Sequence, residues 1–368
     1  MSKKIKICSV ILFLMIITVP LCRFDFREHV KSNLDNRMLT ENPFSKPIDP
    51  NALGTELSAY FSDRMGFRGE AVYAYTALNN SLFRVMEHPY YMKGQDGYIF
   101  IRKNSNVVFT DFHRDFADMI VQIDRYCKKR GVPFLFVFEP EKLSVMREFA
   151  PVGMNYDDSW VDEFLDILDQ NGVDYVDNTV ILTQKHREGI PVFNRQYDAG
   201  HWNDIGAFYG VNCILEGMQR RCPQIKLNTE DEFSIGEKQE RDLQQNGVMV
   251  EEKVPEYKPK VKPEVLTKKY KEGLKLDPSY RYFYYSKRDD KQSPKTLMFQ
   301  GSYMNTRGYK FMANALNEYI AVHDYQNIFD FEYYYEKFKP EYVVFEVAEY
   351  TFLDLYFNTE KLKGFSPE

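Results

Sequence analysis

The sequence predicts an α/β protein whose parallel central sheet is covered by helices on both faces. Three apolar runs, VPFLFVF, TLMFQ and EYVVFEV, have the length and continuity of strands that are buried on both sides. Amphipathic stretches separate these runs, as the crossover connections between parallel strands require. The hydrophobic content of 44% in 368 residues supplies enough apolar side chains for a sizeable core.

A nearly uncharged run, IKICSVILFLMIITVPLC, lies near the start of the chain between lysines and Arg23. Positive charge before an apolar segment keeps the N-terminus in the cytoplasm and sends the rest outward. The run is somewhat short for a span of about 30 Å, so a cleaved signal peptide is the alternative. No small-x-small cleavage site follows, so we expect an uncleaved signal-anchor over residues 1–22. The remaining chain is then extracytoplasmic, or secreted or periplasmic if the anchor is cleaved.

The region between the expected anchor and the α/β part contains a tether, a helical segment and a short strand. Residues 23–55 are charged and contain three prolines, which indicates a tether. The segment 56–83 has apolar residues at helical spacing, with an interruption expected at Gly66. The stretch GQDGYIFI then predicts a turn followed by a short strand.

Helices and strands alternate from here on. Helices are predicted over 111–130, 156–172, 177–189, from about 204 to 221, 304–319 and 328–340, and strands over 132–138, 173–177, 296–300 and 341–347. Residues 223–295 break the rhythm, because they are dense in Lys, Glu, Asp and Pro and their few apolar residues follow neither period. We expect a charged, loop-rich insertion within one domain that spans 56–368.

Several classes of function are disfavoured. A net charge of -6 argues against a general nucleic-acid binder. The five cysteines have no zinc-site spacing, and no Gly-rich nucleotide motif occurs, so neither a metal nor a cofactor is expected.

The strand TLMFQ runs into a candidate nucleophile. Gly301 permits a tight turn, and Ser302 stands at a strand-to-helix junction, where backbone N–H groups face developing negative charge. A serine needs a base, which His201 supplies, and Asp198 on the same loop would hold that imidazole in the correct tautomer. We predict that the three side chains meet at the carboxyl ends of the strands. The structural alternative is an ordinary turn, a helix cap and a packed histidine.

Four stretches carry a resemblance to a known family. They are YFSDRMGFRGEAVYAYTALNNSLF with GQDGYIF, VPFLFVFEPEKLSVMREFAP, YDAGHWNDIGA, and TLMFQGSYMN with PEYVVFEVAEYTF. In this order, from about residue 57 to 355, they resemble the alginate O-acetyltransferase group of SGNH-hydrolase-like proteins.

The resemblance implies a flavodoxin-like three-layer sandwich with a mostly parallel sheet. It also implies a bacterial, membrane-anchored or exported enzyme that acylates a surface polysaccharide through an acyl-enzyme on Ser302, with His201 as the base and Asp198 as the third member. The acetyl donor would be a multi-pass membrane O-acyltransferase.

Other residues match the family less directly. Lys142 and Arg68 stand at matching positions and are candidates for substrate binding. Asn305 is a candidate for holding the oxyanion. Trp202 would either stack on a sugar ring or pack beneath the histidine loop.

Three departures keep alternatives open. The family often has one residue between the Asp and the His, and here Asp198 stands three residues before the histidine. Gly301 replaces an expected aspartate, and Tyr350 replaces an expected arginine. An esterase that uses the same three residues, and a non-catalytic glycan-binding envelope protein, are therefore the alternatives to an O-acetyltransferase. The sugar, the acyl group and the oligomeric state do not follow from the sequence.

Overall fold

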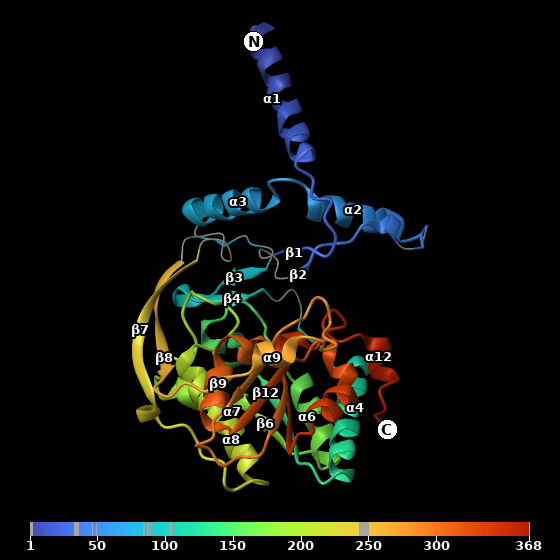
Figure 1. The fold of residues 1–368 in the computed structure, drawn as a ribbon. Helices are drawn as coiled ribbons and strands as arrows, with labels where there is room; N and C mark the ends of the chain where they lie inside the picture. Colours follow the sequence, from blue (N-terminus) through green and yellow to red (C-terminus); the bar gives the residue numbers. More distant parts are fainter. Residues whose placement is uncertain are drawn as a thin grey trace. The chain divides into compact units, whose positions relative to one another are not determined.

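The computed structural model describes residues 3–32, 37–45, 47–48, 50–83, 85–86, 88, 90–102, 106–242 and 250–367. The chain divides into two compact units (Figure 1). One is Met1–Lys93 with Arg241–Glu251, and the other is Gly94–Glu240 with Glu252–Glu368. The unit that contains the sheet starts at Gly94, and the predicted domain over 56–368 stays a prediction.

The N-terminal unit is mostly helical. It contains α1 (Lys3–Cys22), an antiparallel pair of β1 (Lys31–Ser32) and β2 (Arg37–Met38), η1 (Pro43–Ser45), α2 (Leu53–Arg64), α3 (Arg68–Phe83) and β3 (Tyr91–Lys93). The segment Lys4–Cys22 has a mean hydropathy of 2.5, so α1 is long and apolar enough to cross a bilayer. The predicted helix with a break near Gly66 is confirmed as α2 and α3. The short elements β1, β2 and η1 lie within residues 23–55, and the role of this segment as a tether stays a prediction.

The α/β unit is built on a seven-stranded sheet. The strands follow the order β6 (Tyr175–Asp177), β5 (Phe134–Glu139), β13 (Tyr342–Ala348), β11 (Thr296–Gln300), β12 (Glu318–His323), β10 (Phe283–Lys287) and β9 (Glu264–Val265). The first five are parallel, whereas β10 runs antiparallel to β12 and β9 antiparallel to β10. The predicted α/β fold with a mostly parallel sheet is confirmed.

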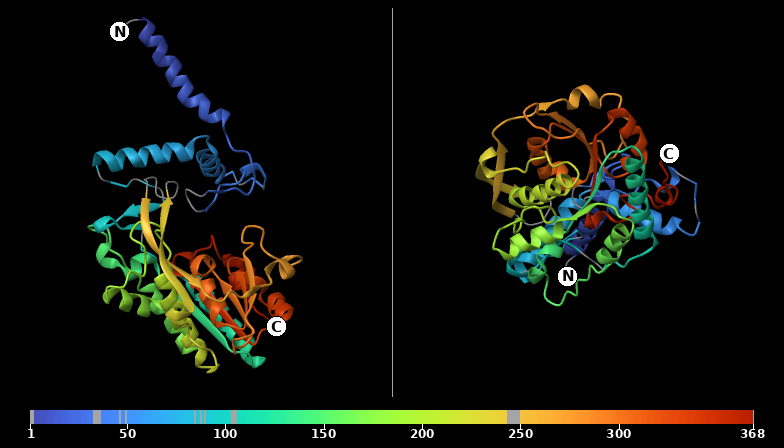
Figure 2. Two further views of the ribbon diagram at one scale, coloured as in Figure 1. Left: turned by 60° about the vertical axis from the view of Figure 1, so that its left-hand side comes forward. Right: turned by 90° about the horizontal axis from the view of Figure 1, so that it is seen from below.

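Helices cover both faces of the sheet (Figure 2). On one face, the alternate side chains Phe134, Phe136 and Phe138 belong to a core cluster with α4 (Asp111–Lys129), α6 (Trp160–Gln170) and α11 (Phe331–Phe338). The other face contacts α7 (Asn178–Arg187), α8 (Asp204–Gln219) and α10 (Tyr309–Ala315). Shorter elements are η2 (Gln95–Gly97), β4 (Ile99–Ile101), α5 (Lys142–Val145), η3 (Arg147–Phe149), η4 (Glu230–Glu232), η6 (Asn327–Asp330), η7 (Glu349–Thr351) and α12 (Thr359–Lys363).

Two predictions for the second half of the chain are wrong. The helix expected over 304–319 ends at Ala315, and residues 318–323 form β12. This segment is inserted between β11 and β10, so pairing on both sides decides its conformation. Residues 223–295 are also less irregular than expected. They form the two-stranded ribbon of β7 (Phe233–Asp242) and β8 (Val250–Pro259), then α9 (Thr267–Lys271), and two strands of the central sheet.

Candidate active site

Ser302, His201 and Asp198 form one chain of hydrogen bonds in the α/β unit. Nδ1 of His201 lies 2.7 Å from Oδ1 of Asp198, and Nε2 lies 2.8 Å from Oγ of Ser302. An ionised Asp198 accepts the proton on Nδ1, so Nε2 is the acceptor and the serine hydroxyl donates to it. The side chain of His201 is 20% exposed, so the imidazole is accessible from outside. The structure thus brings together the three residues that the sequence singled out.

The carboxyl group of Asp198 is held in its ionised form. Burial opposes ionisation, but the charge and hydrogen bonds of His201, with the guanidinium of Arg307, outweigh it and hold the pKa of Asp198 well below its usual range. Nη2 of Arg307 lies 3.4 Å from Oδ2 of Asp198, and Nη1 lies 3.7 Å from Asp204. Arg307 comes from η5, a π-helical turn over Met304–Gly308, and sequence reasoning missed it.

Asp198 and His201 lie on the loop between α7 and α8, not at the end of a strand. Asp198 has a φ of 59°, a left-handed conformation that Asp tolerates better than most residues. The carboxylate of Glu252 on β8 accepts the backbone N–H groups of three successive loop residues, at 2.7 Å from Arg195 and 2.8 Å from Gln196 and Tyr197. The charged segment 223–295 therefore helps to position the histidine loop, which its composition did not indicate.

Lys142 holds the same loop from the other side. Its Nζ donates to the carbonyl oxygens of Ile99 at 2.8 Å and Arg195 at 3.1 Å, and the residue is 1% exposed. Burial lowers the pKa of this lysine to about 7, against the opposing charges of Asp198 and Glu252. The prediction that Lys142 binds substrate is wrong, because a side chain buried in this way cannot reach a ligand.

Trp202 packs beneath the histidine loop and does not face solvent. It is 0% exposed, and its Nε1 donates to the carbonyl oxygen of Tyr303 at 3.1 Å. Gly210 makes room for the indole, since an added Cβ there would stand 2.2 Å from the ring. Of the two readings of this tryptophan, packing is correct and stacking on a sugar is wrong.

The nucleophile turn follows β11. The N–H of Gly301 donates to Oε2 of Glu346 at 2.6 Å, which fixes the backbone just before Ser302. A helical stretch begins at Ser302, so its first N–H groups have no partner within the helix. Asn305 is half-buried one turn later, and its side-chain oxygen accepts from Nε2 of Gln300 at 2.8 Å. Its part in holding an oxyanion stays a prediction.

The contact that Tyr350 makes with the nucleophile was not predicted from the sequence. Its hydroxyl makes a short hydrogen bond with Oγ of Ser302. Since Ser302 donates its only proton to His201, Tyr350 is the donor in this pair. Tyr350 follows β13, the neighbour of β11, and it stands where an arginine was expected. That departure from the family pattern was the signal that marked the position.

Acidic side chains are buried beneath this turn. Glu346, Asp324 and Glu139 are all 0% exposed, and burial raises the pKa of each. Glu349 accepts hydrogen bonds from the N–H of Glu141 at 2.9 Å and from Tyr156 at 2.7 Å. Neither Glu346 nor Glu349 is a surface residue, since they are 0% and 3% exposed.

Arg68 begins α3, in a different unit from Ser302, His201 and Asp198, and its part in substrate binding stays a prediction.

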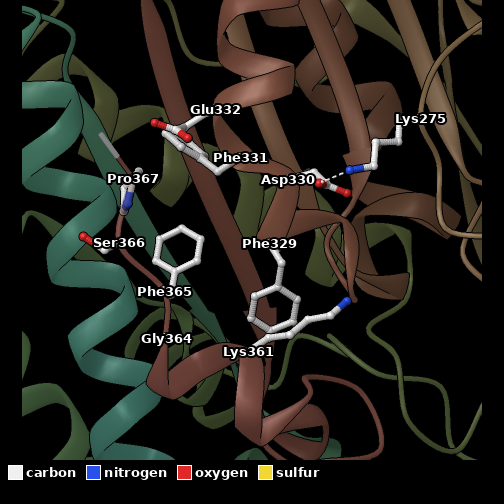
Figure 3. Close-up of a pocket in the computed structure, with 10 residues that line it drawn as sticks. All are labelled: Lys275, Phe329, Asp330, Phe331, Glu332, Lys361, Gly364, Phe365, Ser366 and Pro367. Atoms are coloured by element: carbon white, nitrogen blue, oxygen red, sulfur yellow. Dashed lines mark hydrogen bonds and ion pairs between the residues drawn. The ribbon is translucent and has the colours of Figure 1, made fainter.

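The hollow in Figure 3 lies between η6, α11 and the residues after α12, with Nζ of Lys275 2.5 Å from Oδ1 of Asp330. None of the three site residues lines it. Among the described residues, no cluster of three or more His, Cys, Asp or Glu is arranged to hold a metal ion.

A Ser-His-Asp chain on the rim of a mostly parallel sheet with helices on both faces defines an SGNH hydrolase-like α/β protein. The model of the family described as "SGNH hydrolase-like domain, acetyltransferase AlgX" matches residues 92–315, and the chain belongs to this family. The predicted relationship and the prediction of an SGNH-type enzyme are confirmed.

Two solved structures, with TM-scores of 0.56 and 0.50, show the same fold at low identity. PatB1 of Bacillus cereus, solved with a sulfonyl adduct, is 15% identical with a TM-score of 0.56, over 75% of this chain and 100% of that one. A DHHW family protein from Eubacterium siraeum is 13% identical with a TM-score of 0.50, over 76% and 100%. The O-acetyltransferase domain of Pseudomonas putida AlgJ is 13% identical with a TM-score of 0.48, over 72% and 92%. No curated protein matches the sequence.

Proposed function

We propose that this protein is an extracytoplasmic serine O-acyltransferase that O-acetylates a cell-envelope polysaccharide. The observation that carries the proposal is the unbroken hydrogen-bond chain from Asp198 through His201 to Ser302. Membership of an acetyltransferase family supports the acyl group, and the apolar helix α1 supports a single-pass anchor in the bacterial cell membrane.

The geometry accounts for each proton. Oγ of Ser302 attacks the acyl carbonyl while its proton passes to Nε2 of His201, and the imidazolium then protonates the leaving group as the acyl-enzyme forms. A sugar hydroxyl next gives its proton to Nε2 and attacks the ester, and Ser302 recovers its proton on release. The free N–H groups at the helix start, with Asn305 as a further donor, face the oxyanion in this proposal.

A hollow beside the nucleophile helix suits the acceptor glycan. Its lining includes Thr306, Arg307, Tyr309, Tyr257, Lys258 and Tyr284. Thr306 is one turn from the nucleophile, and its hydroxyl donates to the carbonyl oxygen of Ser302 at 2.7 Å. Tyrosine rings offer flat apolar faces to sugar rings. The acetyl donor would be a multi-pass membrane O-acyltransferase.

The test measures release of acetyl from an activated acetyl ester by the wild type and by Ser302→Ala. We expect the variant to lose about three orders of magnitude or more in kcat. Ser279→Ala, at an exposed serine outside both the hydrogen-bond chain and the hollow, is the matched control. Wild-type turnover in Ser302→Ala would end the proposal. It would instead favour a non-catalytic glycan-binding protein.

The same assay separates transfer from hydrolysis. An O-acyltransferase forms acetylated oligosaccharide faster than free acetate when an acceptor glycan is added. An esterase with the same three residues releases acetate at the same rate with or without the glycan.

A further inference from the structure

Helix α3 exposes a row of apolar side chains along its length. Thr76 is its one buried residue, and Tyr75, Leu78 and Leu82 are 59%, 56% and 63% exposed. Together with Ala71, these three follow the spacing i, i+4, i+7 and i+11, so they form one stripe along the helix. Both charged side chains, Arg68 and Glu70, lie in the first turn. No charge follows up to Phe83.

The start of α3 is tied to the end of the apolar helix α1. The turn between α2 and α3 donates the N–H of Gly66 to the carbonyl oxygen of Pro20 at 3.2 Å. The guanidinium of Arg23 lies 5.6 Å from the ring of Phe67. An added Cβ at Gly66 would stand 2.3 Å from Cβ of Arg23, so only glycine permits this approach.

Aromatic rings gather at the same junction. The ring of Phe24, just after α1, lies 5.4 Å from Tyr60 and 5.5 Å from Phe61 on α2. Phe26 is 78% exposed, and its ring lies 4.8 Å from that of Phe24. Phe and Leu side chains are typical of the apolar face that an interfacial segment buries at the lipid boundary.

We propose that α3 lies in the plane of the membrane with the stripe Ala71, Tyr75, Leu78 and Leu82 buried at the lipid interface. In Figure 1, α3 runs crosswise to α1, as a helix parallel to the bilayer surface must if α1 crosses it. An interfacial helix has one apolar face and sinks that face into the boundary between headgroups and acyl chains. This inference rests on the proposed anchor and adds a second membrane contact that limits tilting of the N-terminal unit.

Lipid is favoured as the occupant over a partner protein. The contact between Gly66 and Pro20 places the start of α3 at the level where α1 leaves the bilayer, so lipid is present there without recruitment. The stripe is also free of charged residues, which offers a protein partner no ion pair for specific recognition.

The test uses the full chain in vesicles of phosphatidylcholine and phosphatidylglycerol that contain a diazirine phospholipid. After illumination, mass spectrometry locates the labelled residues. We expect label on α1 and on the stripe of α3. Label on α1 without α3 would overturn the inference and leave the anchor intact. Label on neither helix would show that the anchor itself is wrong, which is a failure of the proposed localisation.

Matched variants test the orientation of the helix. Tyr75→Glu with Leu82→Glu places two charges on the stripe, and Tyr73→Glu with Asn80→Glu places two charges at the same spacing on the opposite side. We expect a several-fold loss of label on α3 in the first pair and no change in the second. Turnover of the soluble activated ester shows whether both double variants remain folded. Burial in lipid is contradicted if the two double variants carry equal label on α3. It is also contradicted if label is lost only when a membrane acyltransferase is present in the vesicles.

Discussion

Oγ of Ser302 lies 2.8 Å from Nε2 of His201, although 101 residues separate them along the chain. The contact joins the turn after β11 to the loop before α8. Anything that shifts either segment therefore changes the proton transfer on which the proposed reaction depends.

Tyr350→Phe should slow the reaction without preventing it. The tyrosine donates to Oγ of Ser302, so its loss removes a stabilising contact as the serine becomes nucleophilic. A hydrogen bond to a charged group contributes about 1.5–3 kcal/mol, which corresponds to a drop in kcat of about tenfold to a hundredfold. Steady-state kinetics with an activated ester measure it. A change in KM alone would assign Tyr350 to substrate binding.

Asp198→Asn should lower kcat by about 10³- to 10⁴-fold, because an amide cannot keep His201 in the required tautomer. The same variant has a signature in stability. The folded-state pKa of Asp198 lies below 3.8, so its contribution to the free energy of unfolding is present above about pH 4 and is lost as pH falls through the folded value. Urea unfolding should show the difference between wild type and variant narrowing below pH 4. A constant difference would mean that the charge is not responsible.

Glu252→Ala should impair catalysis from a distance. The variant removes the acceptor for three N–H groups of the histidine loop, and a small displacement of His201 costs about tenfold or more in kcat. Glu251→Ala, at the preceding exposed residue of β8, is the control and should behave as wild type. Equal activity in both variants would show that the loop is held by other contacts.

Glu346→Gln should raise stability at high pH. Burial raises the pKa of Glu346 well above 4.5, so the folded state keeps a proton that the unfolded state releases near pH 4.5. The free energy of unfolding of the wild type then falls as pH rises above that value, by at most about 1.4 kcal/mol per pH unit. Urea unfolding at pH 5 and pH 8 should show a growing advantage of the variant, and none for the exposed Glu360→Gln. A variant that loses stability at pH 8 would show that the acid is ionised.

Tyr309→Ala should separate the acceptor from the acyl group. Its ring lines the proposed glycan hollow, outside the hydrogen-bond chain. We expect a KM for the oligosaccharide acceptor that is about tenfold higher, from the loss of about 1–2 kcal/mol of ring contact, with unchanged hydrolysis of an activated ester. Unchanged KM would place the acceptor elsewhere.

Local patterns in the sequence were sufficient to predict the central strands of the sheet and the helices α4 and α6 that cover one of its faces. Continuous apolar runs such as that of β5 predict strands buried on both sides, and amphipathic periods such as that of α4 predict the helices that cover them. Ser302, His201 and Asp198 were also predicted from the sequence, because each belongs to a short motif whose residue types indicate a nucleophile, a base and an orienting carboxylate.

Only the tertiary structure decided the conformation of residues 318–323 and the contacts that support the site, because both depend on neighbours that are remote in sequence. Residues 318–323 become β12 only because β11 and β10 pair with them on both sides. Glu252 reaches the site from a segment with no motif of its own, and the contact of Tyr350 with Ser302 follows only from the fold. Lys142 and Trp202 are buried supports. A hydrogen bond between segments that are remote in sequence produces no periodic pattern of residues. The three reacting residues could therefore be predicted from the sequence, whereas the residues that hold them in place could be identified only from the packing.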